Sequence, residues 1–403
     1  MRILWVKVGG LWPLNTGGRL RSFHTIAQLA RRHRVTVLTT HGPADAPEGL
    51  DAQLADCEQV LSVPYAVPGH DSARFALALV RSWLSPLPVD IWRCRVPALR
   101  REVARHLARG HTDLCVVDFL AAAPNVAMDG PVPSVLFAHN VEHMIWKRLS
   151  QIETRAWRRA LLEVEWQKLR RYEARACARA RLTVAVSEVD REILATHAPR
   201  ARVEAIPTGV DTAYFAPDRS DEIPGSLVFF GSMDWLPNED GIEYFVESIL
   251  PRIRAEAPEV SLTVVGRNPS PRVRRLAAVA GVRVTGTVED VRPHVAAAAV
   301  CVVPLRIGGG TRLKIFEALA MGKAVVSTTV GAEGLPLIPG RHFLQVDDPA
   351  QFADAVVALL RAPARRRALG SAGRRLVEER YSWSQVAREF EAICEDVVGG
   401  HAC

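Results

Sequence analysis

The stretch GGGTRLKIFEALAMGKAVVST, residues 308–328, joins three successive glycines to an apolar helical pattern and a short β-rich run. Glycines adopt backbone angles closed to other residues and let amide N–H groups approach an anion closely. The helix that follows has a positive N-terminal end, and Arg312 and Lys314 add two charges within its first turns. This arrangement predicts a binding site for a diphosphate.

Glu317 lies three residues after Lys314, on a neighbouring face of the same helix. Its carboxylate can accept hydrogen bonds from two adjacent hydroxyls, such as those of a ribose. The alternative is that the glycines only turn the chain, the cations are solvated, and Glu317 pairs with Lys314 or Lys323. The residues predicted to bind the donor in this stretch are Gly308, Gly309, Gly310, Thr311, Arg312, Lys314 and Glu317.

Short β-rich runs alternate with helical patterns in both halves of the chain, which predicts parallel sheets covered by helices. A segment rich in proline, glycine and aspartate, 203–226, separates the halves and predicts a hinge. Ligands of such sheets bind beyond the carboxyl ends of the strands. The expected strands are 2–8, 35–40, 114–118, 134–138 and 182–187, then 227–231, 262–266, 282–286, 299–304 and 324–328.

With 403 residues, the chain is long enough for two domains. Its seven cysteines are scattered and odd in number, which favours reduced thiols in a cytoplasmic protein over a disulfide scaffold or a zinc site. The N-terminus reads as a buried strand and not as a signal peptide, and no apolar run approaches the roughly 20 residues of a membrane span. A net charge of +7 favours anionic partners.

Several motifs together resemble retaining glycosyltransferases of family 4, which have the GT-B fold. The specific motifs are IPTGVD and the glycine-rich block with its EALAMGK helix, and supporting ones are FAHNVEH, AVSEVDREIL and FFGSMDW. The resemblance implies an α/β fold of two facing Rossmann-like domains with parallel sheets and a cleft between them. The expected division is an acceptor-binding domain 1–205, a nucleotide-sugar-binding domain 206–381, and a C-terminal helix 382–403 that returns to the first domain.

The sequence departs from the family pattern at two places on the donor side. The family commonly carries two glutamates eight residues apart; Glu317 matches the second, which binds the ribose, whereas Gly309 replaces the first. After the first strand of the second domain, Asn238 and its neighbours stand where the family often has a cation. Arg312 and Lys314 are therefore expected to bind the phosphates. Arg267 is either a third cation of the site or a solvated loop residue.

In the first half, Gly17 and Gly18 follow the first strand and either approach the diphosphate or form a simple turn. His139 ends the strand 134–138 at the position of a functional histidine of the family. A neutral imidazole there would hydrogen-bond a sugar hydroxyl and orient the anomeric carbon, and the alternative is a cap on the strand. Asp118 also ends a strand, where it faces the acceptor or serves as a turn residue.

The acceptor side is less well defined in the sequence. Glu142 contacts the acceptor or caps the next helix, and Trp92 and Arg93 lie in the aromatic, basic segment 81–95, which suits a sugar or lipid-phosphate acceptor or is a loop over the core. The helical stretch 144–181 is strongly basic and contains three tryptophans, as expected for a peripheral helix on an anionic membrane or for a solvated domain helix. No nucleic-acid-binding module is present.

The resulting hypothesis is a metal-independent, retaining sugar transferase that uses a nucleotide-diphosphate sugar, a UDP-sugar in the first instance, and a glycan or lipid-linked acceptor. No D-x-D triplet occurs to hold a divalent metal, and no cofactor is expected. The expected location is the cytoplasm or the inner face of the membrane, in polysaccharide biosynthesis. Two alternatives remain open: a nucleotide-sugar 2-epimerase of the same fold, which would need Asp118 or Glu142 as catalytic carboxylates, and a nucleotide-sugar-binding protein without turnover.

Overall fold

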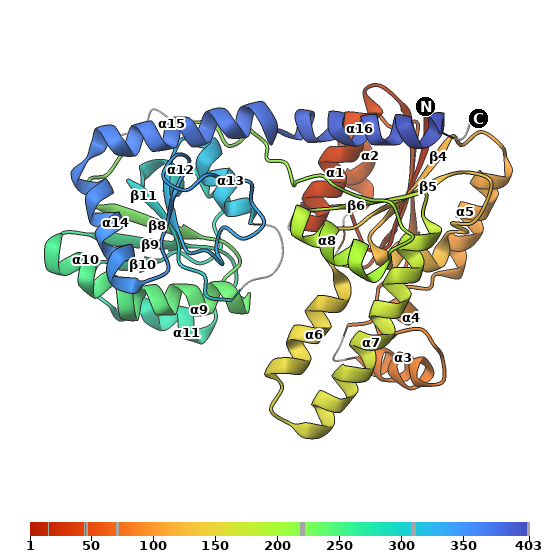
Figure 1. The fold of residues 1–403 in the computed structure, drawn as a ribbon, viewed down its shortest axis with the longest axis horizontal. Helices are drawn as coiled ribbons and strands as arrows, with labels where there is room; N and C mark the ends of the chain where they lie inside the picture. The colour runs from red at the N-terminus through yellow and green to blue at the C-terminus, as the bar shows by residue number, and fades with distance from the viewer. Residues whose placement is uncertain are drawn as a thin grey trace. The chain divides into compact units, whose positions relative to one another are not determined.

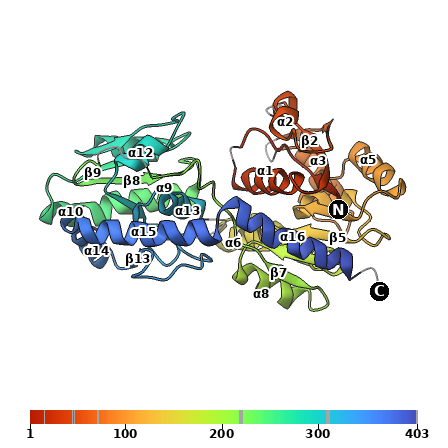
Figure 2. The same ribbon diagram turned by 90° about the horizontal axis from the view of Figure 1, so that it is seen from above.

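The computed structural model describes residues 1–14, 16–43, 45, 47–69, 72–217, 222–307 and 312–400. The chain divides into two compact units. Unit 1 comprises Met1–Pro207 and Val386–Cys403, and unit 2 comprises Thr208–Gln385. Each unit contains one parallel sheet with helices on both of its faces (Figures 1 and 2).

The sheet of unit 1 has seven parallel strands in the described part of the chain, and their order reverses direction between β1 and β4. In spatial order, the strands are β3 (Gln59–Pro64), β2 (Arg34–His41), β1 (Arg2–Lys7), β4 (Leu114–Asp118), β5 (Ser134–Phe137), β6 (Leu182–Ala185) and β7 (Val203–Ala205). The helices are α1 (Gly17–Ala30), α2 (Pro47–Gln53), α3 (Ala73–Trp83), α4 (Val89–Arg93), α5 (Pro97–Ala108), a 3₁₀ turn at Leu120–Asn125, α6 (Glu142–Ile152), α7 (Ala156–Arg179) and α8 (Glu188–His197).

The sheet of unit 2 has six parallel strands among the described residues, with the corresponding reversal between β8 and β11. In spatial order, they are β10 (Val282–Val284), β9 (Ser261–Val265), β8 (Ser226–Phe230), β11 (Val300–Val303), β12 (Ala324–Ser327) and β13 (Leu344–Gln345). The helices are α9 (Leu236–Tyr244), a π-helical turn at Phe245–Ile249, α10 (Leu250–Glu256), α11 (Pro271–Arg275), a 3₁₀ turn at Leu276–Ala278, α12 (Arg292–Ala297), α13 (Leu313–Ala320), α14 (Pro349–Arg361) and α15 (Pro363–Arg380).

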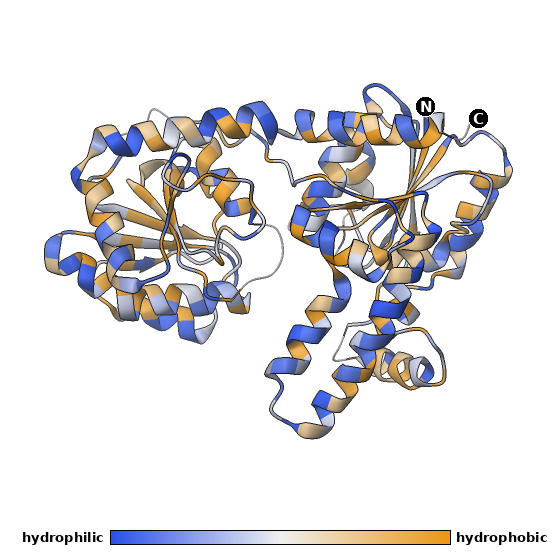
Figure 3. Cartoon of the chain, viewed as in Figure 1, coloured by the Kyte–Doolittle hydropathy of each residue, from blue (hydrophilic) through white to orange (hydrophobic). Residues whose placement is uncertain are grey.

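The strands fold this way because they are apolar on both faces, as parallel strands under two helical layers must be. Every residue of β4, β5, β6, β8, β11 and β12 is buried, and Figure 3 shows the hydrophobic colour concentrated in the sheets. The last helix, α16 (Trp383–Gly399), completes the core of unit 1. The ring of its Phe390 lies 5.8 Å from that of Trp5 and 4.8 Å from that of Phe137.

The prediction of two Rossmann-like domains with parallel sheets is confirmed. Each expected strand is present, with its ends shifted by at most two residues, whereas β3, β7 and β13 were not predicted. The basic stretch 144–181 is not one helix but two, α6 and α7, interrupted between Ile152 and Ala156. The two helices pack against each other and project from the sheet of unit 1 (Figure 1). Among the described residues, no helix is long and apolar enough to cross a bilayer.

Candidate functional site

At the reversal point of the unit 1 sheet, a lysine and an aspartate end adjacent strands. Such points are where ligands of open α/β sheets bind. Lys7 ends β1 and Asp118 ends β4, and Lys7 Nζ lies 3.2 Å from Asp118 Oδ2. The indole N–H of Trp5 donates to the same oxygen at 2.9 Å. His139, two residues after β5, lies with Nε2 2.7 Å from Asp118 Oδ1.

The side chain of Asp118 is fully buried, and its partners determine its charge. Burial alone would raise the pKa of Asp118, but Lys7 and His139 hold this pKa below its ordinary value. Burial lowers the pKa of His139 to about 3 despite the neighbouring carboxylate, so the imidazole is neutral. Because a carboxylate can only accept, His139 Nε2 carries the ring proton and Nδ1 is an acceptor.

Asp118 therefore positions other groups. A carboxylate that is 0% exposed and bound by Trp5, Lys7 and His139 does not face an acceptor, which corrects the expectation that Asp118 contacts one. His139 lies just after the strand, as expected, and its Nε2 donates to Asp118. Its ring is held in one tautomer and orientation by Asp118.

Phe119 fixes the imidazole from a second direction. Its ring stacks on His139 with a centroid separation of 3.7 Å and an interplanar angle of 5°, and Lys7 Nζ lies 4.1 Å from its centroid. Phe119 has a φ of 67°, a strained conformation for a residue with a bulky side chain. A Cβ at Gly18 would come within 2.4 Å of Phe119 Cζ, so glycine is required there for this packing.

Gly17 and Gly18 are the first two residues of α1, which Thr16 caps. Their amide N–H groups lie at the N-terminus of a 14-residue helix, where no intrahelical acceptor is available for them. Arg21, one turn later, is buried and donates to three carbonyls at the carboxyl ends of neighbouring strands. The acceptors are Ala138 O at 2.9 Å, Ala185 O at 3.4 Å and Ile206 O at 2.8 Å.

In unit 2, Lys314 lies at the corresponding reversal point. It is the second residue of α13, and its Nζ donates to Asn238 Oδ1 at 2.6 Å and lies 4.4 Å from the ring centroid of Phe229. The amide of Asn238 in turn donates to Ser232 O at 2.8 Å, so the loop after β8 holds the lysine. Burial lowers the pKa of Lys314 to about 7.

Glu317 follows one turn later on α13 and is partly buried. Burial raises its pKa to about 7, an effect that Lys314 partly offsets. Its carboxylate forms no hydrogen bond or ion pair with any described residue, so it pairs with neither Lys314 nor Lys323. Lys323 instead donates to Ala298 O at 2.9 Å and to Ala296 O. A partly buried carboxylate without hydrogen-bond donors is energetically unfavourable, and a ligand with hydroxyl groups would supply such donors.

Two further cations lie in this part of unit 2. Arg267, just past β9, donates from Nε to Ser232 Oγ at 2.8 Å, which connects it through Ser232 to Asn238 and Lys314. Arg312 is the N-cap residue of α13, and its buried guanidinium donates to Val330 O at 3.2 Å. The predicted diphosphate residues Gly308, Gly309, Gly310 and Thr311 lie outside the described residues.

Apart from Asp118, the residues predicted for the acceptor side do not join the cluster of Trp5, Lys7, Asp118, Phe119 and His139. Trp92 and Arg93 belong to α4, where Arg93 Nη2 pairs with Asp90 Oδ1 at 2.7 Å. Glu142 is the first residue of α6 and lines a pocket of about 570 Å³ between α3, α6 and α7, together with Asp90. Burial, with Glu173 and Asp90 nearby, raises the pKa of Glu142 to about 8.

Sequence reasoning missed Lys7 and Phe119, and it treated Asn238 only as a missing cation. The one available signal was a lysine inside the otherwise apolar run LWVKV, which indicates a buried charge with a partner elsewhere in the chain. Potential metal ligands lie close together at one place outside these clusters. One group of three lies within the described residues, His33, Glu391 and Glu395, but Arg32 and His33 already pair with Glu391.

Comparison with known families accounts for both units. A family model described as Glycosyltransferase Family 4 matches residues 17–214, and one described as Glycosyl transferases group 1 matches residues 224–362. The chain belongs to glycosyltransferase family 4. Except for Trp5 and Lys7, the residues of both clusters lie within the matched ranges.

Curated relatives of this family 4 glycosyltransferase align over part of their length. It is 30% identical over 224 residues to phosphatidyl-myo-inositol mannosyltransferase of Mycobacterium leprae, which covers 53% of this chain and 59% of that protein. It is 27% identical over 213 residues to a GDP-mannose-dependent monoacylated alpha-(1-6)-phosphatidylinositol monomannoside mannosyltransferase of Corynebacterium glutamicum, covering 48% and 56%. The chain thus spans less than two thirds of these relatives.

Solved structures establish the fold of this family 4 glycosyltransferase over its whole length. Sucrose-phosphate synthase from Thermosynechococcus elongatus superposes with a TM-score of 0.72 at 18% identity, over 99% of this chain and 100% of that one. Anabaena Alr3699/HepE in complex with UDP superposes with a TM-score of 0.68 at 14% identity, over 98% and 100%. At these identities the likeness concerns the fold alone, which is of the GT-B type.

Proposed function

We propose that this chain transfers a sugar from a nucleotide-diphosphate sugar to a glycan or lipid-linked acceptor, with retention of the anomeric configuration and without a metal ion. The observation that carries the proposal is the pair Lys314 and Glu317. Both are ionisable, both have pKa values moved to about 7 by burial, and Glu317 has no hydrogen-bond or ion-pair partner in the part of the chain that the structure describes. Perturbed groups in such a position are typical of binding and catalytic sites.

On the donor side, Lys314 would bind the diphosphate, and this contact would keep its ammonium group charged. Arg267, which is linked to Lys314 through Ser232 and Asn238, and Arg312, at the N-cap of α13, would add positive charge. Ionised Glu317 would accept hydrogen bonds from the two ribose hydroxyls, which would supply donors that none of the described residues provides. The glycines 308–310 remain a proposed part of this site.

In unit 1, His139 would bind the transferred sugar. Its Nδ1 is an acceptor because Nε2 donates to Asp118, so it would accept from a sugar hydroxyl and orient the anomeric carbon. The amide groups of Gly17 and Gly18 would donate to the diphosphate. Trp92, Arg93 and Glu142 remain proposed acceptor residues.

During transfer, the bond between the anomeric carbon and the diphosphate oxygen breaks, and a bond from the acceptor oxygen forms on the same face of the sugar. The acceptor proton passes to the departing phosphate. Lys314 and Arg312 would favour this step because the leaving group gains negative charge as it departs. Cationic side chains would thus stabilise the leaving diphosphate in place of a divalent metal ion, consistent with the absence of a D-x-D triplet from the sequence.

The names of the relatives suggest substrates to test. They act on phosphatidylinositol-based lipids, and the second uses GDP-mannose. We therefore propose a membrane-linked acceptor on the cytoplasmic side, and a donor that carries either guanine or the uracil expected from the sequence. The epimerase alternative loses support because the carboxylate of Asp118 is buried and bound.

Thermal unfolding in the presence of UDP- and GDP-sugars, with and without a chelator, tests the proposal, because a ligand that binds only the folded state raises the melting temperature. We expect selective stabilisation that a chelator leaves unchanged and that Glu317→Gln reduces at the same concentration of nucleotide sugar. The matched control is Glu256→Gln, since Glu256 is a half-exposed partner of Arg361 in unit 2. Stabilisation by no nucleotide sugar, or activity that requires added magnesium, would overturn the proposal, and conversion to an epimeric nucleotide sugar without an acceptor would identify the isomerase.

A further inference from the structure

Helix α3 turns apolar side chains toward solvent. Leu77, Val80 and Trp83 are 51%, 53% and 49% exposed, and Leu84, which ends the helix, is 88% exposed. At 100° per residue, these four positions lie within one sector of about 120°. A stripe of this width normally faces a protein core, yet here it faces outward.

The other residues of α3 form its inner face and a cationic edge. Its inner face carries the buried residues Ala78 and Ser82, which anchor it to unit 1. Lys168 of α7 donates to Ser82 O at 2.8 Å and to Ser82 Oγ at 3.0 Å. Arg74 and Arg81 lie between the inner face and the apolar stripe, and neither forms an ion pair with a described residue. The helix therefore has an anchored face, a cationic edge and an exposed apolar face.

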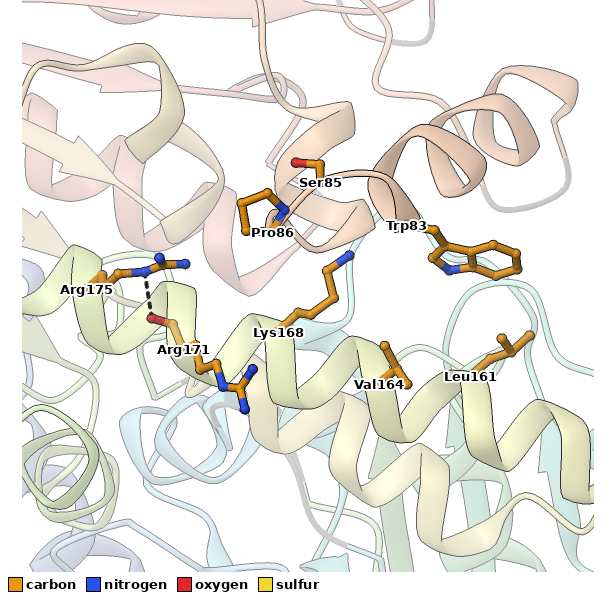
Figure 4. A pocket seen from close by; sticks show the side chains of 8 residues that line it. All are labelled: Trp83, Ser85, Pro86, Leu161, Val164, Lys168, Arg171 and Arg175. Carbon is orange, nitrogen blue, oxygen red and sulfur yellow. Dashed lines mark hydrogen bonds between the residues drawn. The ribbon is translucent and has the colours of Figure 1, made fainter.

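The apolar surface continues onto α7 across a pocket of about 520 Å³. Figure 4 shows Trp83 at one end of this pocket, opposite Leu161 and Val164 of α7, while Arg171 and Arg175 follow further along the helix. Val164 is 52% exposed, and both arginines are exposed. The wall of the pocket thus changes from apolar to cationic along one helix, as the profile of a bilayer changes from acyl chains to phosphates.

We propose that α3, with the adjoining wall of α7, is the surface by which this protein docks on a bilayer of anionic phospholipids. Leu77, Val80, Trp83 and Leu84 enter the boundary between headgroups and acyl chains, and Arg74, Arg81, Arg171 and Arg175 contact lipid phosphates. The proposal deepens the function proposed above, since it supplies the surface on which a lipid-linked acceptor is met.

The chemistry of the patch favours a membrane over a protein partner or a second copy of the chain. Within the described part of α3 and the loop 84–88 there is no acidic residue, and the cations border the apolar stripe along its length. Amphipathic helices that lie in the membrane interface combine a basic border with tryptophan and leucine on the apolar face. The sequence left 144–181 as either a peripheral membrane helix or a solvated domain helix. The α7 wall of that stretch belongs to the proposed surface, and Trp157 on it is 62% exposed, whereas Trp146 donates to Asp90 of α4 and Trp166 to Glu163 of α7.

Flotation of the full chain with vesicles tests the surface without any glycosyl transfer. We expect binding to vesicles that contain phosphatidylglycerol, much weaker binding to phosphatidylcholine alone, and release by high salt. Replacing both Leu77 and Leu84 by serine is expected to weaken binding at least about tenfold. The matched control replaces Ile223 and Ile338, which are 55% and 51% exposed in unit 2, and should bind as the unaltered chain does.

The cationic edge is tested with Arg74→Gln and Arg81→Gln, each expected to weaken binding about fivefold. Arg283→Gln, on the exposed side of β10, is the control. Equal binding of the leucine variant and its control, or no binding to anionic vesicles, would overturn the proposal, as would a leucine variant that only abolishes self-association in sedimentation velocity. The melting temperature of each variant shows whether it is folded. The rise of that temperature with a nucleotide sugar tests the proposed function, and this rise can be absent while binding to vesicles is retained.

Discussion

The two units place ionisable side chains at equivalent positions, the carboxyl ends of strands at the reversal point of a parallel sheet, but treat them differently. In unit 1, the carboxylate of Asp118 is fully buried and is bound by Trp5, Lys7 and His139. In unit 2, Lys314 is held by Asn238, whereas Glu317, one turn away, has no partner among the described residues.

This difference separates two uses of buried charge. A buried ion pair with its partners in place fixes the positions of other groups, because removing one member leaves the other uncompensated. A partly buried carboxylate without donors is poorly satisfied until a ligand supplies them. We therefore expect changes in the unit 1 cluster to affect folding first, and changes in the unit 2 cluster to affect the substrate first.

The largest effect is expected for Asp118→Asn. It leaves the buried Lys7 without a counter-charge and should reduce the free energy of unfolding by about 3–5 kcal/mol, measured by urea denaturation. Because folding lowers the pKa of Asp118, its contribution is present above the pKa of an unfolded aspartate and is lost in more acidic solution. Asp129→Asn is the control, since Asp129 pairs with Arg179 on the surface and should change stability by less than about 1 kcal/mol. Similar losses in both variants would contradict the comparison.

Lys314→Ala should lower kcat by about 10²–10³ if the ammonium group stabilises the leaving diphosphate, with little change in melting temperature. Steady-state kinetics with the nucleotide sugar found by thermal shift gives this number. Arg283→Ala, a cation elsewhere in unit 2, should leave kcat unchanged. A lower melting temperature with an unchanged kcat would show that Lys314 stabilises the fold and does not act on the leaving group.

Glu317→Gln should weaken donor binding by about 10- to 100-fold, the value of hydrogen bonds to a charged group, as measured by calorimetry. The variant should be at least as stable as the unaltered chain, because it removes a partly buried charge that has no partner among the residues described. A loss of stability would show that Glu317 has a protein partner after all.

Gly18→Ala tests whether the unit 1 cluster depends on the close packing of Phe119 against α1. The added methyl would meet the ring of Phe119 at 2.4 Å, and that ring is held between Lys7 and His139. We expect a loss of about 1–3 kcal/mol despite the better helix propensity of alanine, together with reduced turnover from a displaced imidazole. An alanine variant as active and stable as the unaltered chain would contradict the packing argument.

The smallest effect is expected for the pH dependence of donor affinity. Donor binding needs protonated Lys314 and ionised Glu317, and both pKa values are about 7 in the free protein. Affinity should therefore be greatest near neutral pH, falling above it as Lys314 loses its proton and below it as Glu317 gains one. The acid limb should be absent in Glu317→Gln. Calorimetric titrations across this range would reveal a flat profile if either group is not involved.

Much of the fold could be predicted because its strands are continuous apolar runs bounded by turn residues. The strand ending at Asp118 was predicted to the residue, and that before His139 to within one. The missed strands lack this signal: β3 contains a serine and is only partly buried, β7 has three residues and β13 has two.

The site could be predicted less completely. Glu317, Lys314 and His139 were recognised because local patterns and strand ends mark them. The contact of Lys7 with Asp118 could not be recognised, because it joins strands far apart in the sequence and depends on the pairing register of β1 with β4. The placement of Phe119 depends on a backbone angle that its sequence does not favour.

The docking of Phe390 against Trp5 and Phe137 has a consequence for biogenesis. These aromatic rings belong to β1, β5 and α16, which lie far apart in the sequence, so the core of unit 1 stays incomplete until α16 has left the ribosome. Unit 2, whose residues 208–385 are contiguous, can acquire its own core earlier. Nascent chains halted before α16 should therefore expose an aromatic surface in unit 1 and depend on chaperones to stay soluble.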